Sequence, residues 1–87
     1  MDRWQAMRVF VKVAETGSFA STARQMHMSA PAVTRIVAGL EDLIGARLLV
    51  RPTRSVKTTD AGSRYLQDCR RILGDIAEAE LAAAGHY

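Results

Sequence analysis

The sequence predicts a mainly α-helical domain, in which three short helices precede a hairpin and one long helix. Two observations support this prediction: apolar residues recur at helical spacing in each helical segment, and capping residues stand where each segment begins. With 87 residues, the chain is long enough for one hydrophobic core but not for two. An apolar fraction of 48% excludes a disordered polyelectrolyte.

The composition also indicates the compartment. The lone cysteine, Cys69, excludes an internal disulfide framework and fits a reducing environment. The uninterrupted apolar runs are too short to span a membrane, and the N-terminal residues do not have the pattern of a secretion signal. We therefore expect a cytoplasmic protein with no membrane partner.

The first helix is expected to begin after Asp2, which can cap it, while Gln5 completes a capping-box pattern. Gly17 is placed to end this helix in the left-handed conformation. Trp4 is interpreted as a core residue. The expected buried face consists of apolar residues at helical spacing: Met7, Phe10, Val11 and Ala14.

Only residues 27–29 separate the second helix from the third, and this short break suits two helices that cross steeply, as in a helix-turn-helix. Ser18 and Ser29 are the expected N-caps, and Pro31 falls in the first turn of the third helix, where its missing N–H is tolerated. Gly45 is expected to end that helix. The predicted inner faces are Phe19, Ala20, Ala23 and Met26 in the second helix and Val33, Val37, Leu40 and Ile44 in the third.

A hairpin and a long helix complete the prediction. Residues 48–50 and 55–58 are short extended candidates on either side of residues 51–54, which form a basic tip. Thr59 is expected to cap the last helix. The apolar stripe of this helix is longer than so small a domain can cover, which indicates a partner helix. The stripe consists of Leu66, Cys69, Leu73, Ile76, Glu80 and Ala83.

These elements together predict a winged helix-turn-helix, with a three-helix core and a two-stranded wing, over residues 1–58. A linker and dimerisation helix is expected over residues 59–87. Positive charge is concentrated in the first part, where nine Lys/Arg against four Asp/Glu give +5. Three Lys/Arg against five Asp/Glu give −2 in the second part. This distribution is typical of a domain whose first part meets a polyanion.

Four motifs occur in a characteristic order. GSF precedes the second helix, SAPAVTR opens the third, LEDLIGARLLVR leads into the wing and TDAG follows it. Together they resemble the N-terminal DNA-binding domain of LysR-type transcriptional regulators. The resemblance implies a bacterial transcription regulator that binds an interrupted inverted repeat in double-stranded DNA as a homodimer. It also implies antiparallel pairing of the last helices, a tetramer at full length and a small-molecule effector bound by a separate C-terminal domain.

The second helix of a helix-turn-helix meets base edges through its N-terminal residues, which here are Ser29, Ala30, Pro31, Thr34 and Arg35. Arg35 suits a guanine or a phosphate, and Thr34 can donate a hydrogen bond or touch a thymine methyl group. Ser29 can cap the helix or approach a phosphate. Ala30 stands where many family members have glutamine, so only apolar contact is expected there.

The wing is expected to contribute Arg51 and Arg54, and Arg54 at its tip suits a narrow, A·T-rich minor groove. A solvated basic loop is the alternative for these residues, and Arg51 can instead pair with Glu41 or Asp42. The expected dimerisation residues lie on the last helix: Leu66, Cys69, Leu73 and Ile76.

A second functional interpretation is a helical protein-interaction module that pairs through the last helix and does not bind nucleic acid. It leaves the basic residues of the third helix and wing unexplained. An enzyme is not expected, because the sequence has no nucleophile–base pair, carboxylate dyad or phosphate-cradling glycine loop. One cysteine and two distant histidines do not make a metal site, and no cofactor is expected.

Overall fold

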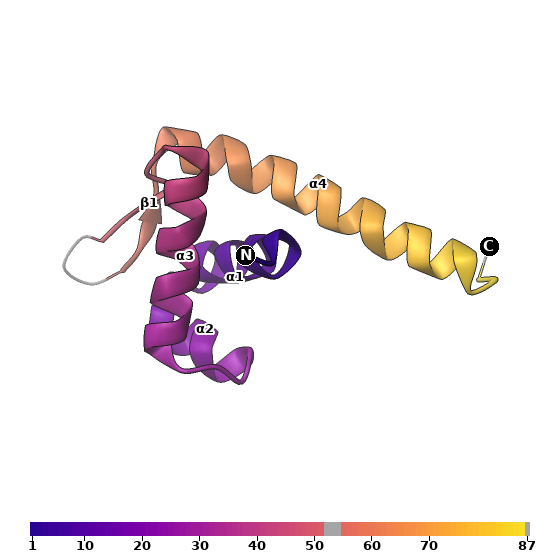
Figure 1. The fold of residues 1–87 in the computed structure, drawn as a ribbon, viewed down its shortest axis with the longest axis horizontal. Helices are drawn as coiled ribbons and strands as arrows, with labels where there is room; N and C mark the ends of the chain where they lie inside the picture. The colour runs from indigo at the N-terminus through magenta and orange to yellow at the C-terminus, as the bar shows by residue number, and fades with distance from the viewer. Residues whose placement is uncertain (52–54, 87) are drawn as a thin grey trace.

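The computed structural model describes residues 1–51 and 55–86. Within these ranges the chain forms four helices and one two-stranded sheet: α1 (Arg3–Thr16), α2 (Phe19–Gln25), α3 (Ala30–Ile44), β1 (Leu49–Val50), β2 (Lys57–Thr58) and α4 (Asp60–Ala83). Figure 1 shows α1, α2 and α3 gathered at one end of the molecule, while α4 runs away from them toward the C-terminus. The predicted mainly α fold with a two-stranded wing and a long last helix is confirmed.

Each helix begins at a side chain that accepts a hydrogen bond from a backbone N–H of its first turn. The acceptor distances are 2.9–3.2 Å, and the four predicted caps are confirmed: Asp2, Ser18, Ser29 and Thr59. Such a cap stabilises a helix by about 1 kcal/mol. The predicted ends of α1 and α3 are confirmed as well, because Gly17 and Gly45 are left-handed, with φ of 68° and 80°.

The hydrophobic core surrounds α1, which contacts α2, α3 and α4. Phe10 is fully buried as predicted, but Met7, Val11 and Ala14 are only half-buried. The prediction of the buried face of α1 is therefore wrong by one residue, which is a rotation of about 100°. The reason is that three neighbouring helices decide which positions are enclosed, and Met7 and Val11 pack against the core from its edge. The enclosed positions of α1 are Ala6, Val9, Phe10 and Val13.

Two residues predicted to face inward, Ala20 and Ile44, are exposed. Ile44 is 43% exposed because it is the last residue of α3, where the chain turns at Gly45. In α2 the buried position belongs instead to Thr22, whose hydroxyl group hydrogen-bonds with that of Thr16 at 2.9 Å. This bond satisfies the hydroxyl group of Thr22, so burying the residue leaves no polar group without a hydrogen-bond partner. Four other predicted core residues of α2 and α3 are buried: Ala23, Val33, Val37 and Leu40.

Trp4 is not a core residue, which corrects the interpretation from the sequence. It lies in the first turn of α1, 46% of it is exposed, and the guanidinium carbon of Arg8 lies 5.2 Å from the centre of its ring. Its neighbours across a shallow cleft are Leu73 and Ile76 of α4. Trp4 therefore belongs to the surface between α1 and α4.

The wing is a short antiparallel ribbon in which Leu49 pairs with Thr58 and Val50 with Lys57. Its strands are shorter than the extended segments predicted from the sequence. The N–H of Val56 donates to the carbonyl oxygen of Gly17 at 2.9 Å, which fastens the wing to the corner between α1 and α2. Residues 52–54, and with them the predicted minor-groove residue Arg54, lie outside the described residues.

The first half of α4 contributes to the hydrophobic core of the domain. The ring of Tyr65 lies 5.5 Å from that of Phe10, measured between centroids, and Cys69 is fully buried. Burial raises the pKa of the Cys69 thiol, while burial and the neighbouring Cys69 together raise the pKa of Tyr65 to about 12. Both groups are therefore uncharged near neutral pH. Of the helices described in residues 1–51 and 55–86, none has the length and apolarity needed to cross a membrane.

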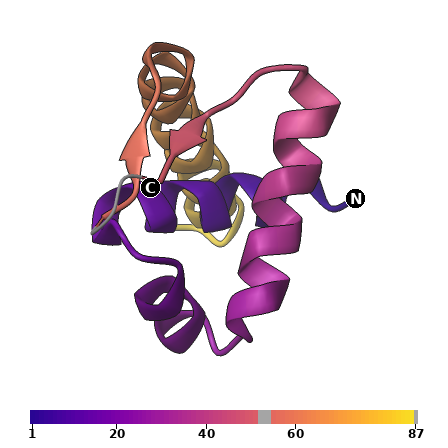
Figure 2. The same cartoon turned by 90° about the vertical axis from the view of Figure 1, so that its left-hand side faces the viewer.

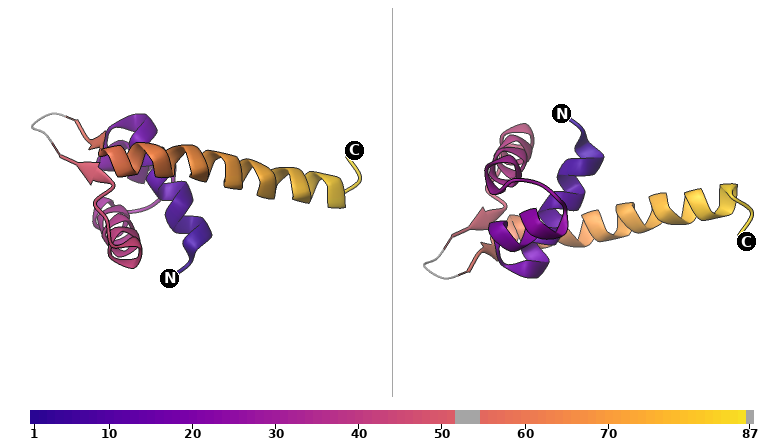
Figure 3. Two further views of the ribbon diagram at one scale, coloured as in Figure 1. Left: turned by 90° about the horizontal axis from the view of Figure 1, so that it is seen from above. Right: turned by 90° about the horizontal axis from the view of Figure 1, so that it is seen from below.

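Figure 3 shows from two sides that the C-terminal half of α4 extends beyond all the other elements. Residues 77–83 of this half are exposed, as are residues 84–86 that follow it. Exposed apolar side chains on α4 include Ile72 at 38% and Leu81 at 43%. The length of this helix and its uncovered end agree with the prediction that the small domain cannot cover it.

Candidate nucleic-acid interface

The turn between α2 and α3 sets the angle at which α3 is presented. His27 adopts a left-handed conformation with φ of 57°, and the N–H of Met28 donates to the carbonyl oxygen of Ala23 at 2.8 Å. Figure 2, which faces the side of the molecule that carries the wing, shows α2, α3 and the wing around one surface. A helix-turn-helix and a wing that share one face define a winged helix-turn-helix domain.

The N-terminal turns of α3 are accessible. Val33 and Val37 are buried against the body, while Thr34 is half-buried. The remaining predicted contact residues of α3 are exposed: Ser29, Ala30, Pro31 and Arg35. The hydroxyl of Ser29 already accepts the N–H of Ala32 at 3.2 Å, so its first role is that of a cap. The structure thus places the five predicted residues on or beside one exposed helical surface.

Arg35 lies where the N-terminus of the chain meets α3. It lines a shallow pocket with Met1, Asp2 and Gln5 of the N-terminal segment and with Ala32 and Ile36 of α3. Arg35 takes part in no ion pair within residues 1–51 and 55–86. Its guanidinium group is therefore available to an outside anion or base edge.

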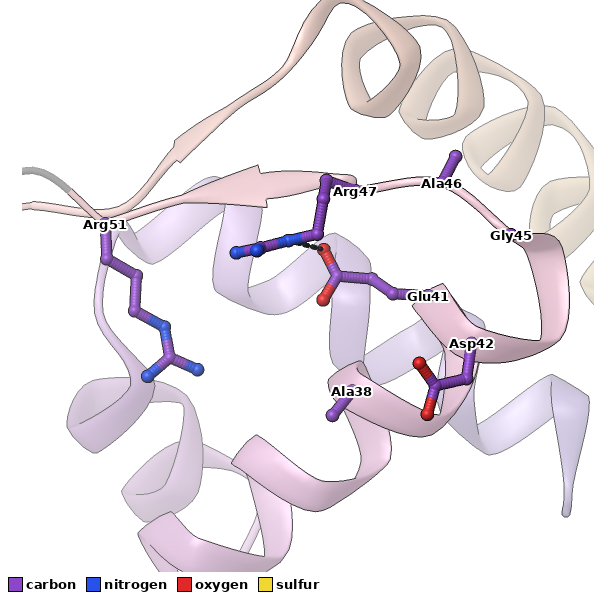
Figure 4. Close-up of a pocket in the computed structure, with 7 residues that line it drawn as sticks. All are labelled: Ala38, Glu41, Asp42, Gly45, Ala46, Arg47 and Arg51. Atoms are coloured by element: carbon purple, nitrogen blue, oxygen red, sulfur yellow. Dashed lines mark ion pairs between the residues drawn. The ribbon is translucent and has the colours of Figure 1, made fainter.

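A second pocket lies between the C-terminal half of α3 and the start of the wing, as drawn in Figure 4. The carboxylate of Glu41 is 3.4 Å from Nε of Arg47 and accepts the backbone N–H groups of Leu48 at 2.7 Å and Leu49 at 3.3 Å. Glu41 therefore fixes the entry to the wing. This role of Glu41 cannot be predicted from the sequence, because nothing in the LE motif indicates what its carboxylate contacts.

Arg51 does not form the ion pair with Glu41 or Asp42 that the sequence left open, as far as the described residues show. Figure 4 shows its side chain on the other side of the pocket from Asp42. Its guanidinium carbon lies 4.2 Å from the centre of the Phe19 ring at the start of α2. Phe19 was expected only as an inner-face residue, so this contact is an addition to the predicted site.

The predicted dimerisation residues of α4 divide into two groups. Cys69 is fully buried within the chain and offers no surface to a second copy, which corrects its assignment. Leu66 packs against the same core. Leu73 and Ile76 are half-buried beside α1 and line the cleft near Trp4. Dimerisation through α4 stays a prediction. The surface available for it lies nearer the C-terminal half of the helix.

No group of three His, Cys, Asp or Glu side chains close enough to hold a metal ion occurs within the described ranges. The arrangement offers guanidinium groups, hydroxyl groups and the first turns of a helix. Such groups bind phosphates and base edges.

Comparison with known proteins agrees with this arrangement. The family described as "Bacterial regulatory helix-turn-helix protein, lysR family" matches residues 4–63. This chain belongs to the LysR family. The HTH-type transcriptional activator AaeR of Escherichia coli (strain K12) is 45% identical over 78 residues, which are 90% of this chain and 25% of that protein. The chain thus spans about a quarter of the length of the curated relatives it matches.

Two solved structures of similar domains contain DNA. The structure titled "Crystal Structure of BenM_DBD/benA site 1 DNA Complex" superposes with a TM-score of 0.91 at 28% identity and covers 97% of this chain and 98% of that one. The structure titled "Crystal structure of CbnR_DBD-DNA complex" has a TM-score of 0.82 at 38% identity and covers 93% and 97% of the two chains. The fold described above is thus that of LysR-family DNA-binding domains.

Proposed function

We propose that this chain is the DNA-binding domain of a bacterial transcription regulator that acts in the cytoplasm as a homodimer. The observation that carries the proposal is the near-complete superposition on domains whose structures were solved with DNA. The exposed first turns of α3 and the concentration of positive charge in residues 1–58 support it independently. A protein-interaction module without nucleic-acid binding accounts for none of these three observations.

In this proposal α3 enters the major groove, and Thr34 and Arg35 meet base edges. Ala30 and Pro31 offer apolar contact, while Ser29 approaches a phosphate from the helix N-terminus. The wing lies beside the adjacent minor groove, where Arg54 reads its width and Arg51 contacts the backbone.

Two such domains require an interrupted inverted repeat, because a two-fold dimer presents two recognition helices. At full length the dimers form a tetramer and a separate domain binds the effector.

The proposal predicts strong salt dependence. If a dimer neutralises about six phosphates, the affinity for its DNA site should fall by about three orders of magnitude between about 50 and 200 mM salt. The site is first selected from a pool of random duplexes, and the Kd is then measured by fluorescence anisotropy. An affinity that stays flat across the salt titration would contradict the nucleic-acid function.

Arg35→Ala should cost about 1–3 kcal/mol of binding free energy and relax the sequence preference at one position of each half-site. The reason is that Arg35 is exposed on the recognition helix and has no ion-pair partner in the described part of the chain. Arg3→Ala is the matched control, because it removes the same charge from an exposed position of α1, outside the recognition helix, the wing and α4. Binding should be compared on the selected site and on single-base variants. Equal small losses for both substitutions would show that Arg35 does not read a base.

A further inference from the structure

Phe19 and Arg51 join the helix-turn-helix to the wing. Phe19 is the first residue of α2, and Arg51 directly follows β1. The guanidinium carbon of Arg51 lies 4.2 Å from the centre of the Phe19 ring, well within the distance of a cation–π interaction. The contact therefore couples two elements that are both expected to lie against DNA.

The ring of this contact is anchored in the fold, and the wing is fastened beside it. The ring of Phe19 is half-buried and packs against the hydrophobic core. The Ser18 cap fixes the start of α2, since its side chain accepts a backbone N–H of the first turn at 3.0 Å. The wing is fastened to the same corner by the 2.9 Å bond from the N–H of Val56 to the carbonyl oxygen of Gly17. The ring is thus a rigid platform for the guanidinium group.

The contact leaves the charge of Arg51 available. Arg51 is exposed and makes no ion pair within the described ranges, and the neighbouring carboxylate of Glu41 is engaged with Arg47. The Phe19 ring offers no carboxylate or carbonyl oxygen, so this contact engages no strong acceptor with the five N–H donors of the guanidinium group. A carboxylate partner, by contrast, would occupy those donors. The cation–π contact therefore restrains the group and still leaves its donors available to an anion.

We propose that Phe19 is a positioning residue, which holds Arg51 so that the guanidinium edge binds a DNA phosphate where α2 and the wing meet. This inference rests on the proposed function. Because phosphates carry no sequence information, the contact contributes equally to binding of any duplex. The contribution of this contact to affinity can therefore be measured separately from base recognition by α3.

The test is a double-mutant cycle on the full 87-residue chain, with a fluorescently labelled duplex of random sequence as the probe. Arg51→Ala should lower the affinity about tenfold and reduce the slope of log Kd against log salt concentration by about 1 for each subunit bound. Phe19→Leu should lower the affinity about two- to fivefold when Arg51 is present. It should have no further effect when residue 51 is already alanine.

Two conservative substitutions separate positioning from a general structural role. Phe19→Tyr keeps the ring face and should bind like the unmodified chain. Arg51→Lys keeps the charge but loses the planar group, so it should retain the salt slope and lose about two- to fivefold in affinity. Thermal unfolding of each variant shows whether the fold is intact. Arg51 is exposed, so its substitutions test the contact even if Phe19→Leu does not fold.

Equal losses from Phe19→Leu in both backgrounds would overturn the positioning role, and so would full affinity in Arg51→Ala or in Arg51→Lys. If the unmodified chain bound no DNA at low salt, the proposed function itself would fail. The two failures are therefore distinguishable in one set of titrations.

Discussion

Gly62→Ala is expected to destabilise the domain by about 3 kcal/mol or more, a large part of the stability of a small protein. Gly62 is buried in the first turn of α4, where a Cβ atom would overlap the carbonyl oxygen of Leu48. That overlap involves backbone atoms, so no side-chain rotation can relieve it.

The backbone of Leu48 cannot shift to make room, because it is held from two sides. Its carbonyl oxygen accepts the N–H of Thr59 at 3.0 Å, and its N–H donates to the carboxylate of Glu41 at 2.7 Å. Alanine at position 62 would therefore separate the start of α4 from the base of the wing. The glycine of the TDAG motif is required by this close approach of two backbone segments.

Gly74→Ala is the matched control, since it makes the same chemical change in the same helix. A Cβ atom at Gly74 meets nothing within 4 Å, so alanine there should stabilise α4 by about 1 kcal/mol. Urea unfolding followed by circular dichroism measures both effects. Gly62→Ala with unchanged stability would show that the contact between α4 and Leu48 is not tight.

Local signals account for the part of the fold that the sequence could predict. A cap such as Ser29 or a helix-ending glycine such as Gly45 acts on its own few residues, so the pattern alone identifies it. The short extended segments on either side of residues 51–54 predict the wing, and the order of the motifs indicates the family.

The residues that the sequence could not place depend on contacts between distant segments. The buried face of α1 is set jointly by three helices, which no single period describes. Gly39, for which the sequence gives no reason, lies under the side chain of Met1, whose terminal methyl carbon would be 2.6 Å from an added Cβ atom. The cation–π contact of Arg51 with Phe19 likewise joins residues from separate motifs. Spacing within one element carries no information about such pairs.

The charges along α4 indicate how two copies of the chain would pair. Its first half carries Arg64, Arg70 and Arg71 against Asp60 and Asp68, for a net charge of +1, while its second half carries Asp75, Glu78 and Glu80 and no Lys/Arg, for −3. Antiparallel pairing places the acidic half of each helix beside the weakly basic half of the other, whereas parallel pairing brings the two acidic halves together. The seam available for this pairing lies on one side of α4 at heptad spacing: Ile72, Ile76, Ala79 and Ala83.

Ile72→Asp should convert the dimer to monomers and lower the affinity for a two-half-site duplex by about a hundredfold or more, because the two domains no longer bind as one unit. Ile72 is chosen because it is 38% exposed in the protomer, whereas Leu73 is half-buried beside α1 and aspartate there would disturb the domain itself. Gln67→Asp is the control, since it adds the same charge on an exposed position away from the seam.

Analytical ultracentrifugation gives the mass of each species, and titration with one-half-site and two-half-site duplexes gives the affinities. Ile72→Asp should bind the single half-site as the unmodified chain does. A monomeric unmodified chain, or an Ile72→Asp variant that still dimerises, would refute pairing through this surface of α4.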